Sequence, residues 1–168
     1  MNFSDLFATA GALYIFAVAW PLSKVDLLEH RLPNKFVLPA FPVLIIGFLI
    51  AAFLGSTWDQ LIAAIFAALI AFTFGLLANR YGSLGMGDVK LIAATTMSLA
   101  WFNLLAPLIA LVLGFVLAAL VIAVQLLKRR TTLQDAMALG PYLLGGFVVT
   151  QILTWSTYFG GLVPNFLL

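Results

Sequence analysis

Long apolar segments separated by short polar ones run through the whole chain. A helix that crosses a bilayer needs about 20 mostly apolar residues. Three segments close to this length are continuous: Leu6–Leu22, Phe36–Leu54 and Leu61–Ala78. The second of them contains Pro39 and Pro42, and we expect its helix to be kinked near its start.

The next apolar stretch, Leu91–Leu127, is too long for a single crossing. Its 37 residues, at about 1.5 Å each, would exceed the thickness of one bilayer. Trp101-Phe102-Asn103, followed by Pro107, predicts a break, with an aromatic belt, a polar turn and a proline that starts the next helix. The predicted fourth, fifth and sixth spans are Val89–Ala100, Leu104–Leu127 and Ala136–Tyr158.

The composition supports the same interpretation. Hydrophobic residues make up 64% of the 168 residues and charged residues 8%, with a mean hydropathy of +1.16. A soluble domain carries about 25% charged residues, so soluble globular and disordered classes are excluded. The chain has no Cys and one His, so disulfide and Cys-zinc scaffolds are excluded and no metal or other cofactor is expected. We predict an all-α polytopic membrane protein with about six transmembrane helices, in one integral-membrane domain over residues 1–168.

The positive charges predict the orientation. All of them lie in the predicted loops 1–2, 3–4 and 5–6, which emerge on one side of the membrane, whereas the opposite side holds Asp5 and Asp59 and no basic residue. The positive-inside bias places these loops in the cytoplasm and both termini outside. A net charge of +2 does not argue for binding of nucleic acid. The eight basic residues are Lys24, Arg31, Lys35, Arg80, Lys90, Lys128, Arg129 and Arg130.

Two acidic residues at the cytoplasmic edge are candidates for chemistry. Asp26 follows the first span and Asp88 precedes the fourth, so an even number of crossings returns both to the same membrane depth. Two facing carboxyl groups share one proton, and one can act as a base towards water while the other acts as an acid towards a carbonyl. The structural alternatives are a helix N-cap for Asp88 and, for Asp26, an interfacial charge paired with Lys24 or Arg31.

Residues beside Asp88 are candidates for binding a substrate. Gly85 and Gly87 permit positive φ and the close approach of another backbone, so a peptide could bind there in extended form. A hairpin turn without further function would also use them. Lys90 could attract a substrate carboxylate or tune the aspartates, or its side chain could extend to the membrane interface.

Several other polar residues allow two interpretations. Asp5 and Asp59 are expected to be solvated charges of outer segments. Glu29 and Asp135 could receive a basic peptide or be solvated loop charges. Asn79, Arg80 and Tyr81, which precede the glycines, are possible loop anchors. The spacing of Gly114 and Ala118 favours close packing of helices.

Two motifs resemble those of the type IV prepilin peptidases, which are membrane aspartic proteases. Gly85-Met86-Gly87-Asp88-Val89-Lys90 matches the family's G-x-G-D-x-K motif. The segment from Asp26 to Pro33-Asn34 resembles its first motif, and Gly140-Pro141-Tyr142 resembles a C-terminal Gly-Pro-aromatic element. Ala138-Leu139 departs from the family there, where Pro and an aromatic residue are expected. The resemblance covers about residues 26–146.

The resemblance implies that Asp26 and Asp88 are the catalytic pair. It implies removal of a short basic leader, usually after a Gly, from prepilins, pseudopilins or preflagellin-like proteins at the cytoplasmic face of a prokaryotic cell membrane. Larger relatives add a region with two C-x-x-C pairs, associated with N-methylation. Because this chain has no Cys and only about 25 residues before Asp26, we expect no methyltransferase activity. Its oligomeric state stays open.

Two other functions compete with this one. Presenilin-like intramembrane proteases also use a G-x-G-D aspartate, but they pair it with a Tyr-Asp and a downstream Pro-Ala-Leu element. Here Val25 precedes Asp26, and no Pro-Ala-Leu follows Asp88. A small proton- or cation-coupled transporter could use the same Asp pair, although such proteins often show internal repeats, and this sequence shows none.

Overall fold

The described residues fold entirely into helices and the turns between them. The structure is a computed structural model, which describes residues 3–29, 31–82, 84–128 and 138–160. The predicted all-α class is confirmed for these residues. The helices are α1 Phe3–Ala8, α2 Ala10–Glu29, α3 Asn34–Val37, α4 Ala40–Gly55, α5 Trp58–Arg80, α6 Met86–Ala100, α7 Ala106–Leu127 and α8 Gly140–Gly160.

These eight helices form six rods, which agrees with the predicted number of segments. Only a turn at Thr9 separates α1 from α2, and only Leu38-Pro39 separates α3 from α4. The predicted kink near the start of the second span is therefore confirmed. Helix α6, with 15 residues, is shorter than a usual membrane span. Four rods are long and apolar enough to cross a membrane by length and composition: Ser4–Glu29, Asn34–Gly55, Trp58–Arg80 and Ala106–Leu127.

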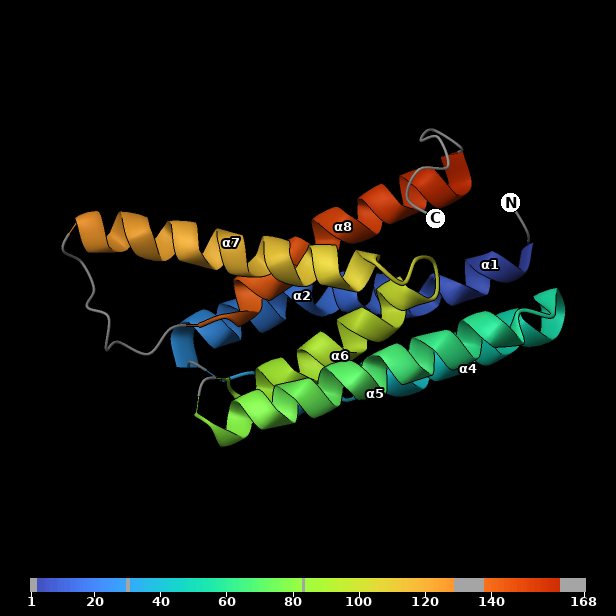
Figure 1. The fold of residues 1–168 in the computed structure, drawn as a ribbon, viewed down its shortest axis with the longest axis horizontal. Coiled ribbons are helices and arrows are strands. Elements are labelled where there is room, and N and C mark those ends of the chain that lie inside the picture. Colours follow the sequence, from blue (N-terminus) through green and yellow to red (C-terminus); the bar gives the residue numbers. More distant parts are fainter. Residues whose placement is uncertain (1–2, 30, 83, 129–137, 161–168) are drawn as a thin grey trace.

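The rods lie roughly along one axis with α6 at the centre. Helices α4 and α5 lie on one side of it, α7 and α8 on the other, and α2 runs alongside (Figure 1). The start of α1 and the end of α8 lie at one end of the bundle. The ends of α2, α5 and α7, near which the described basic residues occur, lie at the other end, as the charge pattern predicted.

The outside of the bundle is apolar. Large side chains such as Phe53, Phe66, Phe74 and Leu120 are exposed on the outer helices, which is typical of a surface that contacts lipid. The chain thus has the surface of a polytopic membrane protein.

The break between α6 and α7 lies where the sequence predicted it, but its aromatic residues do not form an interfacial belt. Trp101 and Phe102 are buried, and the Trp101 ring stacks on Phe48 of α4 with centroids 4.4 Å apart. Because α6 is central, the side chains at its end pack inside the bundle rather than on its outer surface. The expectation of an aromatic belt at these residues is therefore wrong.

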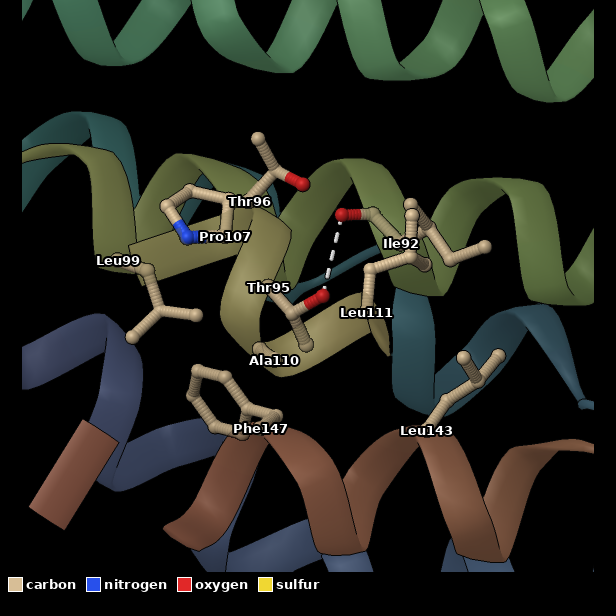
Figure 2. Close-up of a pocket in the computed structure, with 9 residues that line it drawn as sticks. All are labelled: Ile92, Thr95, Thr96, Leu99, Pro107, Ala110, Leu111, Leu143 and Phe147. Atoms are coloured by element: carbon tan, nitrogen blue, oxygen red, sulfur yellow. Dashed lines mark hydrogen bonds between the residues drawn. The ribbon is translucent and has the colours of Figure 1, made fainter. Parts of the chain in front are cut away.

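Helices α7 and α8 pack closely through glycines. A Cβ added at Gly146 would contact the Ala110 carbonyl oxygen and lie 2.7 Å from the Gly114 nitrogen. The packing role predicted for Gly114 is confirmed. Between α6, α7 and α8 remains a cavity of about 10 Å³, enough for one water molecule. Figure 2 shows Thr95 on this cavity, with its hydroxyl donating to the Ile92 carbonyl, and the two candidate aspartates do not line it.

Asp5 differs from its prediction as a solvated charge. It is buried in α1, and Tyr158 of α8 forms side-chain hydrogen bonds with it and with Gln60. The cause is the packing of α1 against α4 together with the end of α8 at the same end of the bundle. Asp59, in the first turn of α5, is exposed as predicted.

Candidate active site

Asp26 lies inside a helix, buried against a second one. Helix α2 continues past the apolar run, through Pro21, to Glu29, and so carries Asp26 into the bundle. The side chain of Asp26 is 4% exposed. Its Oδ2 accepts a hydrogen bond of 2.9 Å from the backbone N–H of Gly140, the first residue of α8. A buried carboxylate needs such a donor, because an unpaired buried charge is costly.

Asp88 lies in the first turn of α6, ahead of the apolar segment Val89–Ala100. Gly85 caps this helix, and its backbone N–H donates to the Asp88 carboxylate, as an acidic residue at the third helical position often accepts from the N-cap. Asp88 therefore stabilises the helix start, as the structural alternative proposed, although from the third position and not as the N-cap itself. Its Oδ1 is buried and has no hydrogen-bond partner among the described residues.

The two carboxyl groups influence each other. The pKa of Asp88 is raised from 3.8 to about 6, first by burial and then by the negative charge of Asp26, while the hydrogen bond from the Gly85 N–H lowers it. The structure thus brings together the two aspartates that the sequence singled out, on α2 and α6. Two interacting carboxyl groups, of which one has its pKa raised to about 6, can together supply a base and an acid.

Leu32 packs between the start of α6, which carries Asp88, and the start of α8, whose Gly140 contacts Asp26. A Cβ added at Gly87 would lie 2.6 Å from the Leu32 Cβ, and one added at Gly140 would lie 3.0 Å from the Leu32 Cδ2. One side chain therefore packs on the first turns of both α6 and α8. Composition and spacing gave no signal for Leu32, since a leucine among so many is not distinctive.

Gly85 and Gly87 have a different role from the conformational one expected. Gly85 has φ −69°, and Gly87 is helical, so neither needs a positive φ; the described glycine that has one is Gly82, with φ 72°. The expected close approach does occur, but the neighbours are Leu32 and the Asp88 carboxylate. Contact of these glycines with a peptide stays a prediction.

The side chains of Lys90 and Asn79 donate hydrogen bonds to residues near the start of α6 and on α3. Lys90 Nζ donates a hydrogen bond of 2.9 Å to Asn34 Oδ1 and so ties α6 to α3. Asn79 Nδ2 donates to the Leu84 carbonyl over 2.7 Å, which confirms it as a loop anchor. Glu29 is exposed. His30, Arg129, Arg130 and Asp135 lie outside the described residues.

The chemistry available here is that of carboxyl groups. Among residues 3–29, 31–82, 84–128 and 138–160, no group of three or more His, Cys, Asp or Glu side chains could hold a metal ion. The residue that sequence reasoning undervalued is Gly140. Its motif was noted, but its contact with Asp26 joins positions 114 residues apart and depends on the packing of α8 against α2.

Comparisons with known proteins point to one family. Residues 12–127 match the type IV leader peptidase family. The chain is 33% identical over 156 residues to the prepilin leader peptidase/N-methyltransferase of Escherichia coli (strain K12), covering 88% of this chain and 66% of that protein. It is 31% identical over 147 residues to the protein of the same name from Pseudomonas putida, covering 81% and 48%. No solved structure matches significantly.

The chain thus spans about half to two thirds of the length of these relatives. Their name includes an N-methyltransferase, and the expectation that this chain lacks that activity stays a prediction. The match includes both Asp26 and Asp88.

Proposed function

Because the chain belongs to the type IV leader peptidase family, we propose that it is a membrane aspartic endopeptidase that removes leader peptides from prepilin-like proteins. The observation that carries the proposal is the pair Asp26 and Asp88. Their carboxyl groups, on two helices, interact at the end of the bundle where the basic residues lie. Asp26 is buried, Asp88 is partly buried, and the charge of Asp26 acts on the Asp88 carboxyl.

The reaction follows from the shared proton. One carboxylate takes a proton from a water molecule, which attacks the scissile carbonyl, while the other carboxyl donates its proton to the carbonyl oxygen. Collapse of the tetrahedral intermediate then breaks the C–N bond and returns a proton to the leaving amine. The pair is active when it holds one proton. The rate therefore falls at low pH, where both groups are protonated, and at high pH, where both are ionised, which gives a bell-shaped pH–rate profile.

The proposed substrates are prepilins, pseudopilins or preflagellin-like proteins with a short basic leader, cut after a Gly. The hydrophobic segment of the substrate stays in the bilayer beside the apolar outer helices. The positive-inside bias of Lys24, Lys35, Arg80 and Lys128 supports a cytoplasmic site in a prokaryotic cell membrane, with both termini outside. Gly85, Gly87 and Lys90 are the proposed contacts for the substrate near Asp88.

Co-expression with a panel of prepilins and pseudopilins tests the proposal. Wild type should shorten at least one substrate on a gel, and mass spectrometry should place the cut after a Gly. Asp26→Asn and Asp88→Asn should each reduce cleavage at least about 100-fold, because each removes one member of the proton pair. Asp59→Asn, which removes an exposed carboxylate at the opposite end, is the matched control and should cleave normally.

Membrane insertion of every variant is confirmed by its abundance in the membrane fraction. Cleavage retained by both Asn variants would remove the aspartic mechanism. Cleavage of no substrate in the panel by wild type would count against the peptidase assignment itself.

A further inference from the structure

The two carboxyl groups of the pair are held by different surroundings. Asp26 Oδ2 accepts the N–H of Gly140, whereas Asp88 Oδ1 faces no donor among the described residues. An oxygen without a donor costs much more in a buried anion than in a neutral carboxyl group. The Gly85 N–H serves the other oxygen of Asp88 and leaves this difference in place.

The donor to Asp26 is also unusually well suited to a negative charge. Gly140 is the first residue of α8, so its N–H has no partner within its own helix and lies at the positive end of the helix dipole. This compensates for the position of Asp26 near the C-terminal end of α2, where a carboxylate is otherwise disfavoured.

The position requires glycine. A Cβ at residue 140 would lie 2.7 Å from Asp26 Oδ2 and 3.0 Å from Leu32 Cδ2, in a site where Asp26 is 4% exposed. The carboxylate could not keep its present position beside such an atom. Gly140 is thus a positioning residue that acts through Asp26 and does not itself touch the reacting atoms.

We propose that the Gly140 amide holds Asp26 in its charged form, so that Asp26 is the base towards water and Asp88 carries the proton given to the carbonyl. This assignment rests on the proposed peptidase function and adds to it the role of each carboxyl group. In the first step the water loses a proton to Asp26 as its oxygen bonds to the carbonyl carbon. The proton of Asp88 moves to the carbonyl oxygen, and the charge of the pair passes from Asp26 to Asp88.

The described helices packed against α2 carry few other ionisable side chains. Among these helices, α4 and α8 contain no Asp, Glu, Lys, Arg or His, and the titratable side chains of α8 are Tyr142 and Tyr158. Asp5 of α1 lies at the far end of the same rod. Helix α6 contributes Asp88 and also Lys90, which bonds to Asn34. Lys24 and Glu29 belong to α2 itself.

A titration that does not depend on cleavage tests the proposal. Purified protein with ¹³C-labelled aspartate carboxyls is followed by infrared spectroscopy from pH 3 to 9, and paired difference spectra isolate each group. Asp26, isolated in Asp88→Asn, should ionise at lower pH than Asp88 isolated in Asp26→Asn. Adding Gly140→Ala to Asp88→Asn should raise the midpoint of Asp26 by roughly one pH unit, the value of a hydrogen bond to a charged group.

Gly145→Ala is the matched control. It adds the same atom to the same helix, but the nearest neighbour, Leu117 Cδ1, would be 3.6 Å away. It should leave the Asp26 midpoint unchanged. In the cleavage assay, Gly140→Ala alone should move the acidic limb of the pH–rate profile upwards, with a roughly tenfold loss at the acidic end and a smaller one near pH 6.

Two results would overturn the proposal. One is that isolated Asp26 ionises at higher pH than isolated Asp88, which reverses the roles. The other is an unchanged Asp26 midpoint in Gly140→Ala protein whose circular dichroism shows intact helices. A failure of the peptidase assignment would appear only in the cleavage assay and would leave the titration readable.

Discussion

At the scale of single residues, Asp88 makes the folded state depend on pH. Its pKa rises from 3.8 to about 6 in the folded protein, so the folded state binds more protons than the unfolded state between these values. The free energy of unfolding therefore falls as the pH rises from about 4 to about 6, and this loss persists above pH 6. The Asp88 carboxyl, the proposed proton donor, therefore lowers the free energy of unfolding at neutral pH.

Asp88→Asn should accordingly stabilise the protein at neutral pH while it abolishes cleavage. Asn can still accept the Gly85 N–H but cannot become a buried anion. The apparent melting temperature in detergent should rise by a few degrees at pH 7.5 and stay unchanged at pH 4. Asp59→Asn should show no such pH-dependent difference, and an Asp88→Asn protein that melts below wild type at pH 7.5 would contradict the argument.

The hydrogen bond between Lys90 and Asn34 should be measurable as a coupling energy. Lys90→Met and Asn34→Ala each remove it, and the double variant should lose less stability than the sum of the two. Because the bond is exposed, we expect a coupling of about 0.5–1 kcal/mol from a double-mutant cycle on thermal or denaturant unfolding. Additive effects would show that the contact does not stabilise the arrangement of α3 and α6.

At the scale of elements, the hydrophobic pattern predicted well where the helices lie in the sequence, but it predicted poorly which of their residues are buried between helices. The apolar runs, Pro39 and the break before Ala106 depend on neighbours in sequence, and their positions agree with the structure. The burial of Asp5 and Trp101 and the contact of Gly140 with Asp26 depend on which helices pack together. In a membrane protein almost every helix is apolar on all sides, so periodicity carries little information about which face is inside.

The packing of α7 on α8 gives an element-scale prediction. Gly146→Ala should destabilise the protein by about 1–3 kcal/mol, because its Cβ would overlap the Ala110 carbonyl oxygen and displace α7. Gly145→Ala, on the same helix, would place its Cβ in ordinary contact with Leu117 Cδ1 at 3.6 Å and should be neutral or slightly stabilising. Thermal unfolding of the two variants side by side measures the difference, and equal melting temperatures would contradict the tight contact.

At the scale of the whole molecule, the number of rods and the distribution of basic residues indicate the same orientation. Six rods return the chain to the end where it began, and the described basic residues gather at the opposite end of the bundle, together with Asp26 and Asp88. The basic leader of the proposed substrates would approach the same end as these positive charges, and acidic groups nearby would offset the repulsion. Asp26 and exposed Glu29 are both on the last two turns of α2.

The absence of cysteine makes this orientation easy to test. Asp59→Cys and Lys35→Cys place single thiols at exposed positions at opposite ends of the bundle. A membrane-impermeant maleimide should label Asp59→Cys in intact cells and Lys35→Cys only after the cells are opened. The reverse pattern would place the Asp pair on the outer face.

The hydrogen bond between Gly140 and Asp26 has a consequence for biosynthesis. Its two partners are 114 residues apart, on α2 and on α8, the last described helix. A ribosome finishes α2 and α6 well before α8 can enter the membrane. The growing chain therefore holds both aspartates before the Gly140 N–H is made, so the hydrogen bonding described for Asp26 is completed only after α8 has been synthesised.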